Sequence, residues 1–99
     1  MAFRLAPQAE TELDAIWLYV ARASGSIEIA NRLIDTIADG LWVIGQHPRI
    51  GRRRDQDLRP GLRSFAVGDY IIVYRIEHED AVILHVMRGS RDIENLLLD

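Results

Sequence analysis

The apolar residues of this chain follow two different periods, and the change between them limits the folds it can adopt. From Pro7 to about Arg22, and again from about Ile27 to Gln46, they recur every three or four positions, as along one face of a helix. From Leu62 onward they alternate with polar residues or run together, which is typical of strands. The chain therefore joins a helical first half to a β-rich second half.

Short polar segments mark the ends of the helices. Pro7 suits the first position of a helix, because its missing N–H would be unsatisfied there in any case. Ser24, Gly25 and Ser26 interrupt the helical pattern, and Ser26 is the expected N-cap of the second helix. Pro48 ends that helix. A break this short predicts two antiparallel helices packed face to face.

The remaining elements complete an expected α+β fold. Strands are predicted over residues 3–5, 62–67, 70–76 and 81–88, and a short last helix over residues 91–98. The predicted order is a strand, a two-helix antiparallel hairpin, a three-stranded antiparallel meander and a short C-terminal helix. Each element has an apolar side that it cannot bury alone, so the hairpin must cover one face of the sheet. At this length the whole chain, residues 1–99, forms one domain.

Composition excludes several classes of site. The chain has no cysteine, which removes disulfides and thiolate metal sites. His47, His78 and His85 lack metal-ligand spacing, so we expect no metal and no other cofactor. No apolar run approaches the roughly 20 residues that cross a bilayer, and the first residues lack the apolar core of a signal peptide. We expect a cytoplasmic protein that contacts no membrane.

Positive charge is concentrated in one segment of an acidic chain. The formal charge is −3 and every one of the 12 basic residues is arginine, yet residues 49–63 hold six arginines and two aspartates, a local charge of +4. A solvated loop would account for this segment, as would a surface that binds nucleic acid or an acidic protein segment. The residues alone leave both interpretations open.

Catalytic groups are hard to find in the sequence. No serine has a base at a recognisable spacing to activate it. Tyr70 and Tyr74 share the parity of the apolar strand residues, so we expect core packing rather than base stacking. Trp17 and Trp42 lie on the two long helices, where core packing is again the more common role. These observations predict no catalytic residue and no small-molecule substrate.

Four stretches together resemble the ParE branch of the ParE/RelE toxin superfamily. They are LAPQAETELDAIWLYVA, HPRIGRRR, LRPGLRSFAVGDYIIVYRI and ILHVMRGSRDIENLL, and they cover nearly the whole chain. The resemblance implies the toxin of a type II toxin–antitoxin pair, held inactive in a hetero-oligomer by a ParD-like antitoxin. It also implies DNA gyrase as the target, with plasmid stabilisation and growth arrest as outcomes. Proteins of the RelE branch share the fold but cleave messenger RNA on the ribosome.

The arginines divide into two hypothetical binding sets under this resemblance. We expect the target to be bound by residues that the meander brings to one end or face of the sheet: Arg63, Arg88 and Arg91. An apolar groove rimmed by arginine should hold the antitoxin. The residues assigned to that groove are Arg49, Arg52, Arg53, Arg54, Arg59 and Trp17.

Two positions favour a non-enzymatic poison over a nuclease. The nuclease branch tends to place an arginine directly after the tyrosine equivalent to Tyr70, where this chain has Ile71. It also tends to carry a tyrosine or histidine in the C-terminal segment, where this chain has leucines at positions 96–98. RNA cleavage requires a proton donor and a proton acceptor, and an arginine with a pKa above 12 serves poorly as either. The alternatives are a RelE-like endonuclease and a decayed toxin that acts only as an interaction module.

The chain departs from the family pattern at two places. Ala6 stands where the family often has a serine N-cap, and alanine has no side-chain acceptor. The last strand ends in Arg-Gly-Ser-Arg-Asp, from Arg88 to Asp92, where His-Gly-Arg-Arg-Asp is common. The second departure lies next to the proposed target-binding residues, so it bears on the strength of toxicity and on the choice of target.

Overall fold

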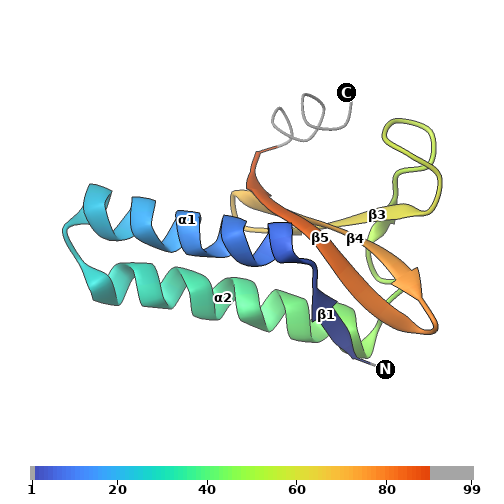
Figure 1. Cartoon of the computed structure of the whole chain (residues 1–99), viewed down its shortest axis with the longest axis horizontal. Helices are drawn as coiled ribbons and strands as arrows, with labels where there is room; N and C mark the ends of the chain where they lie inside the picture. Colours follow the sequence, from blue (N-terminus) through green and yellow to red (C-terminus); the bar gives the residue numbers. More distant parts are fainter. Residues whose placement is uncertain (1, 90–99) are drawn as a thin grey trace.

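The computed structural model describes residues 2–89, and its elements follow the predicted order (Figure 1). They are β1 (Phe3–Leu5), α1 (Pro7–Ser24), α2 (Ile27–Gln46), β2 (Arg52–Arg53), β3 (Leu62–Val67), β4 (Tyr70–Glu77) and β5 (Asp80–Arg88). The predicted α+β class is confirmed. The helix predicted over residues 91–98 lies outside the described residues.

The ends of the helices agree closely with the sequence signals. Helix α1 begins at Pro7, and Ala6 at its N-cap makes no side-chain capping bond. It continues to Ser24, two residues beyond the predicted end, and Gly25 then adopts the left-handed conformation with φ 67°. The hydroxyl oxygen of Ser26 accepts a hydrogen bond from the first turn of α2, as the prediction of an N-cap requires.

The predicted meander forms the centre of a larger, mixed sheet. Its five strands lie in the order β1-β5-β4-β3-β2. Strand β1 pairs with β5 in parallel, while the other pairs are antiparallel. Strand β2 was not predicted, because two residues are too few to show alternation.

The helical hairpin packs against one face of this sheet and extends well beyond it (Figure 1). Ile37, Leu41 and Ile44 of α2 meet the β4 residues of even number. Those residues include both tyrosines that were expected in the core: Tyr70 is 8% exposed and Tyr74 is fully buried. The prediction that at least one tyrosine packs under the helices is therefore confirmed.

The opposite face of the sheet, called here the open face, carries a smaller apolar cluster. Leu62 and Val73 are buried there. Leu58 reaches them from the loop between β2 and β3, while other members of the cluster are only partly buried. These partly buried members are Ile71, Leu84 and Met87.

A β-bulge in β5 changes which side chains reach the open face. Val73 pairs with His85, whereas the next β4 residue, Tyr74, pairs with Ile83, so Leu84 has no partner on β4. Directly paired residues share a face of the sheet, which places His85 on the open face with Val73. Leu84 also packs into the open-face cluster. Two consecutive residues of β5 therefore lie on the same side.

The hydroxyl group of Tyr74 holds the segment that follows α2. It donates a hydrogen bond of 2.6 Å to the carbonyl oxygen of Pro48 and accepts one of 2.9 Å from the N–H of Gly51. Burial raises the pKa of this phenol, so it stays neutral and able to donate. A Cβ atom at Gly51 would lie 2.7 Å from the Tyr74 ring and 2.9 Å from the Ser64 carbonyl oxygen. Only glycine fits so close an approach.

Replacing Tyr74 with phenylalanine tests this anchor. The variant leaves a buried N–H and a buried carbonyl without their partner, so we expect the free energy of unfolding to fall by about 1–3 kcal/mol. Tyr19→Phe is the matched control, because it removes the same hydroxyl group from a side chain that is 61% exposed. Urea unfolding followed by circular dichroism measures both variants. Equal stabilities for the two would show that the Tyr74 hydroxyl group anchors nothing.

Candidate partner-binding surface

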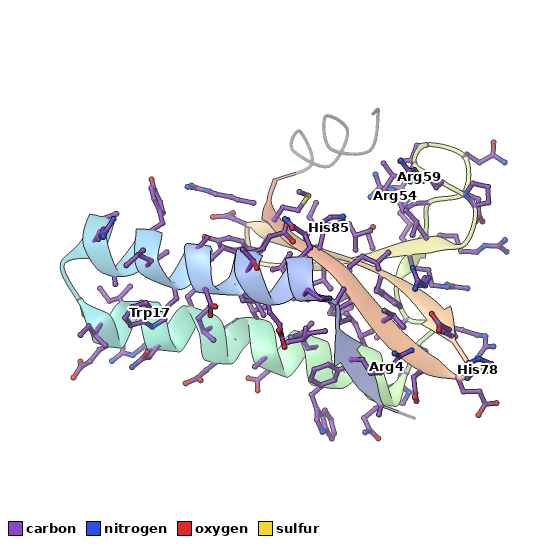
Figure 2. All side chains as sticks on the ribbon, viewed as in Figure 1. Arg4, Trp17, Arg54, Arg59, His78 and His85 are labelled. Carbon is purple, nitrogen blue, oxygen red and sulfur yellow. The ribbon has the colours of Figure 1, made fainter. Side chains whose placement is uncertain are left out.

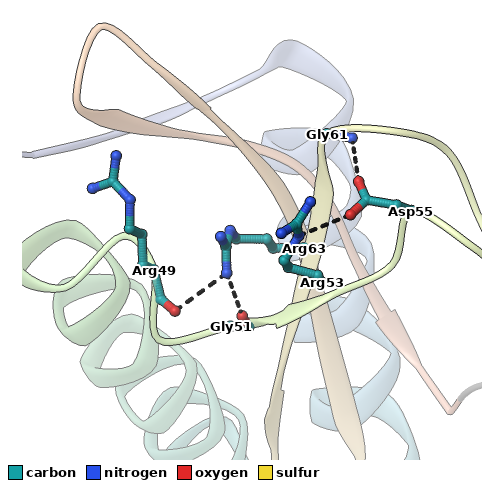
Figure 3. A network of polar contacts seen from close by, with 6 residues as sticks. All are labelled: Arg49, Gly51, Arg53, Asp55, Gly61 and Arg63. Carbon is teal, nitrogen blue, oxygen red and sulfur yellow. Dashed lines mark hydrogen bonds and ion pairs between the residues drawn. The ribbon is translucent and has the colours of Figure 1, made fainter.

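Arg63 lies against the backbone of the segment that Tyr74 anchors (Figure 3). Its NH1 group donates hydrogen bonds to the carbonyl oxygens of Gly51, at 2.9 Å, and Arg49, at 3.3 Å. The residue is partly buried on β3, directly opposite Arg53 on β2. Part of its hydrogen-bonding capacity therefore stabilises the chain entering β2.

Asp55 closes the loop between β2 and β3 (Figure 3). One of its carboxylate oxygens accepts a bond of 2.7 Å from the N–H of Gly61, and the other lies 2.8 Å from the Nε of Arg53. The Gly61 bond, followed by the Arg53 interaction, holds the pKa of Asp55 below its usual value of 3.8. Arg53 keeps most of its side chain exposed, at 72%.

Arg54 is a structural residue, unlike its two neighbours in the arginine run. Only 10% of its side chain is exposed. Its NH1 group donates to the hydroxyl of Ser64 at 2.9 Å, while Nε and NH2 contact the carboxylate of Asp57 at 2.8 and 2.7 Å. The Arg54 guanidinium keeps the pKa of Asp57 below its ordinary range. The sequence assigned Arg54 to the antitoxin, yet the fold uses its guanidinium to secure the loop.

The outward positive charge of this segment is carried by fewer arginines than the sequence suggests. Arg49 and Arg52 are exposed, and within residues 2–89 their guanidinium groups take part in no hydrogen bond or ion pair. Arg59 is also exposed and has contacts of its own. With the exposed part of Arg53, these side chains form the basic side of the loop.

Two of the three residues assigned to the target lie toward different ends of the sheet. Arg63 pairs with Tyr74 on β4, whereas Arg88 pairs with Tyr70 near the other end of that strand. Strand β4 lies between them, and their partners on it are four positions apart. Tyr74 and Tyr70 lie on the same face of β4, and directly paired residues share a face, so Arg63 and Arg88 share a face of the sheet, as one form of the expectation has it, but not an end. Arg91 lies outside the described residues, and the binding role of all three stays a prediction.

Several large apolar side chains of the hairpin are exposed, which was not predicted. Trp17 is partly buried, and its Nε1–H donates a 2.8 Å hydrogen bond to Asn31, which joins α1 to α2. Trp42, expected in the core, is instead 61% exposed. Other large apolar side chains with 43% or more exposure are Leu18, Tyr19, Ile27, Ile29 and Ile50. Exposed apolar side chains indicate a binding surface where they lie together in one patch.

Glu12 joins α1 to β5 next to its bulge. Its Oε1 atom accepts a 3.0 Å bond from the N–H of Val86, and its Oε2 atom lies 3.3 Å from Nδ1 of His85. Strand β1 ends at Leu5 and does not pair with this part of β5, so Glu12 provides the acceptor that a neighbouring strand would have supplied. No sequence signal predicted this contact, because its residues lie 73 positions apart.

The described residues offer little for metal or membrane chemistry. Within residues 2–89, no three His, Cys, Asp or Glu side chains are grouped so that they could hold a metal ion. Among the same residues, no helix combines the length and the apolar character needed to cross a bilayer. Ile71, which stands where the nuclease branch tends to have an arginine, is partly buried in the open-face cluster.

An α+β chain with a two-helix hairpin on a mixed five-stranded sheet is the fold of the ParE/RelE toxins. Residues 3–93 match the family described as ParE toxin of the type II toxin–antitoxin system parDE. The chain therefore belongs to the ParE toxin family, which confirms the resemblance read from its motifs.

Curated relatives from Caulobacter vibrioides match most of the chain. Toxin ParE3 is 34% identical over 82 residues, which cover 83% of this chain and 80% of the relative. Toxin ParE1 is 32% identical, over 90% of this chain and 93% of the relative. Toxin RelE3 is 31% identical, over 87% of this chain and 90% of the relative. Both branch names thus occur among relatives of similar identity.

Solved structures share the fold at lower sequence identity. A chain from the chromosomal ParDE system of P. aeruginosa superposes with a TM-score of 0.78 at 22% identity, covering 91% of this chain and 97% of that one. A chain of the RelBE2 toxin–antitoxin complex of Mycobacterium tuberculosis superposes with a TM-score of 0.63 at 22% identity, covering 88% of this chain and 95% of that one. These two likenesses support the fold.

Arg54→Gln tests the division between structural and outward arginines. Because it leaves Ser64 and Asp57 without their buried partner, we expect a loss of about 1–3 kcal/mol in the free energy of unfolding. Arg52→Gln removes the same charge from an exposed side chain and should change stability by no more than about 0.5 kcal/mol. Chemical unfolding of the purified variants measures both. A larger loss for Arg52→Gln than for Arg54→Gln would reverse the assignment.

Acid should release the Asp55 contact at a predictable pH. A carboxyl group whose pKa is lowered in the folded state stabilises that state above its unfolded pKa, here near 3.8, and the contribution is lost as pH falls through the lowered value. The amide signal of Gly61, followed by NMR against pH, should therefore change with a midpoint below 3.8. Core amides such as that of Ile72 report global unfolding. Asp55→Asn should abolish the transition, and a midpoint at or above the usual value would contradict the contact.

Proposed function

We propose that this chain is a toxin that inhibits DNA gyrase in the cytoplasm without cleaving nucleic acid, and that a ParD-like antitoxin neutralises it in a hetero-oligomer. Membership of the ParE toxin family over residues 3–93 supports the toxin part of this proposal. The ParDE system among the structural neighbours supports an antitoxin of the ParD kind. The choice of gyrase rests on the ParE resemblance.

The chemistry of the open face carries the choice of poison over nuclease. Its centre consists of Leu62, Val73, Ile71, Leu84 and Met87, which have no group able to transfer a proton or to bind a phosphate. The Ser64 hydroxyl group already accepts a hydrogen bond from the buried Arg54 guanidinium. An apolar surface of this kind suits contact with a protein.

The distribution of exposed groups supports an antitoxin of amphipathic and acidic character. The hairpin presents apolar side chains such as Tyr19, Ile27 and Trp42, and the loop presents Arg49 and Arg52. An amphipathic helix would cover the first set, and acidic residues would pair with the second. The loop charges would mainly speed association, because exposed ion pairs contribute only about 0–1 kcal/mol each.

One observation favours a RelE-like ribonuclease as the second candidate. His85 lies on the open face with Glu12 beside its Nδ1 atom, an arrangement that could orient an imidazole as a general base. The relative named RelE3 is nearly as similar as those named ParE. The Glu12 carboxylate also has a structural use, since it accepts the Val86 N–H. We rank the nuclease second because Glu12 already accepts the Val86 N–H and, within residues 2–89, the open-face cluster next to His85 is apolar.

Expression of this chain alone should arrest growth with filamentation and a DNA-damage response. The purified protein should inhibit supercoiling by gyrase and trap gyrase–DNA cleavage complexes, and it should leave ribosome-bound message intact. Supercoiling assays and primer extension on translated message measure the two activities side by side.

His85→Ala serves as the control that separates the candidates. A poison should keep its effect on gyrase in this variant, whereas a nuclease that uses His85 should lose its activity. Codon-positioned cuts that disappear in His85→Ala would establish the second candidate. Soluble protein that neither arrests growth nor affects gyrase would instead indicate a decayed toxin and defeat the proposal.

A further inference from the structure

A pocket of about 540 Å³ lies at the loop end of the β2–β3 pair. It is lined by Arg53 and Arg63, by Asp55 and Gln56, and by residues 60–62. Arg53 and Arg63 are directly paired across the two strands, and directly paired residues share a face of the sheet. Arg63 also pairs with Tyr74, whose side chain lies in the core under the hairpin. Both guanidinium groups therefore start from the hairpin side of the sheet.

The arginines next to Arg53 belong to the opposite side. Arg52 pairs with Ser64, which lies on the open face, and the Arg54 guanidinium donates to the hydroxyl of the same serine. Arg59 lines a separate pocket next to the open-face cluster (Figure 2 labels Arg54 and Arg59). The strand and the loop thus set Arg53 apart from the arginines on either side of it.

The pocket keeps positive charge after its internal contacts are counted. Its lining holds two arginines and one aspartate, a net charge of +1. Asp55 forms its ion pair with Arg53, whereas Arg63 donates to the backbone carbonyl oxygens of Arg49 and Gly51. Carbonyl groups accept hydrogen bonds but carry no net charge. Within residues 2–89, no carboxylate forms an ion pair with Arg63.

Hydrogen-bond donors of both arginines also remain available (Figure 3). Arg53 uses only Nε, so within residues 2–89 its NH1 and NH2 groups make no hydrogen bond, and its side chain is 72% exposed. Arg63 uses only NH1, which leaves Nε and NH2 without an acceptor in the described part of the chain. Like charges directly opposite each other in a sheet repel. An anion bound between them would reduce that repulsion and accept from both.

The surroundings of the two arginines favour a phosphate over the acidic side chain of a protein partner. Leu62 is only 8% exposed, so the pocket offers little apolar surface to the neighbours of such a side chain. The phosphates of a nucleic acid lie on the outside of its backbone and need no apolar surface. Guanidinium groups match phosphate oxygens in geometry and form charge-assisted hydrogen bonds with them.

The charge of the rest of the chain determines how such a phosphate is met. The formal charge is −3, while residues 49–63 carry +4. A free polyanion is therefore attracted at this segment and repelled elsewhere, which makes its binding weak and strongly dependent on salt. A contact of this kind is most effective with DNA that another protein already holds in place.

We propose that Arg53 and Arg63 bind a backbone phosphate of duplex DNA in this pocket. The inference rests on the proposed function in one respect, since the duplex is the one that gyrase holds and the contact helps to place the toxin on it. A phosphate contact carries no base identity, so it acts at any DNA sequence. Arg53, assigned to the antitoxin from the sequence, thereby joins Arg63 at the target.

A short DNA duplex tests the pocket when it is titrated into the purified full chain at low salt and followed by ¹⁵N NMR. The amides of Arg53, Gly61 and Arg63 should shift. Arg53→Gln should reduce the slope of log affinity against log salt by about one, as expected when one phosphate contact is lost. Arg52→Gln is the matched control, because it removes the same charge one residue away on the other face of β2, and it should leave the slope unchanged.

Asp55→Asn supplies a variant that should gain affinity. It removes the negative charge from the pocket lining, while the amide oxygen can still accept the Gly61 N–H. The duplex should then bind about twofold more tightly or better at low salt. Damage to the fold cannot produce such a gain. Thermal unfolding of each variant confirms that the fold is intact.

Three outcomes would overturn the proposal. The first is the absence of shifts at the pocket amides at low salt. The second is the same salt slope for Arg53→Gln and Arg52→Gln. The third is binding of inorganic phosphate, or of a glutamate-rich peptide, as tightly as the duplex, which would mark a site for a small anion or for an acidic protein segment.

Gyrase assays connect the pocket to the proposed function and keep the two separable. Arg53→Gln should trap fewer gyrase–DNA cleavage complexes than Arg52→Gln at the same protein concentration. Equal gyrase inhibition by these two variants, in a chain that arrests growth, would keep the proposed function and defeat this inference. A chain that binds the duplex through Arg53 but does not arrest growth would keep the phosphate contact and lose the proposed function.

Discussion

The buried hydroxyl group of Tyr74 determines where the chain runs between the helical and β-rich halves. It reaches from the centre of β4 to both ends of the Pro48–Gly51 turn, donating to one and accepting from the other. The segment must pass so close to the ring that only glycine fits at position 51. With the turn fixed, the next residues pair with β3 as β2, and Arg63 can bind the turn carbonyls from that strand. The position of the whole arginine segment depends on this anchor.

The arginine segment serves stability and recognition at the same time. Arg54 donates to the Ser64 side chain, and Arg63 donates to the backbone carbonyl of Gly51. Arg53 forms an ion pair with Asp55. A local excess of positive charge would repel itself without such partners, and the aspartates at positions 55 and 57 reduce that repulsion. The arginines that remain outward are therefore displayed on a rigid loop. A preordered surface loses less conformational entropy when a partner binds.

Local sequence signals predicted the local structure well. Apolar periodicity, Pro7 and Ser26 located both helices, with the second matching its bounds and the first ending two residues late. Strand parity placed Tyr70 and Tyr74 in the core. The parallel pairing of β1 with β5 was beyond such signals, because it depends on contacts between distant parts of the chain.

The candidate site was less predictable for the same reason. Arg52 and Arg54 are identical in type and lie two positions apart, yet one is exposed and the other buried, and only the path of the loop distinguishes them. The bulge at Leu84 shifts the alternation of β5, so parity alone would not place Leu84 and His85 on one face. Trp42 was expected in the core, but it stands outside the stripe formed by Ile37, Leu41 and Ile44, and the hairpin leaves it uncovered.

Hydrogen exchange at the Gly51 amide tests the role of the Tyr74 anchor most directly. If the anchor holds the arginine segment as part of the core, this N–H exchanges only through global unfolding, with the same protection free energy as central amides of β4 such as Val73. Added urea should then accelerate both exchange rates with the same dependence. A Gly51 amide that exchanges much faster than Val73, with no dependence on urea, would show that the turn opens locally and that Tyr74 does not control the segment.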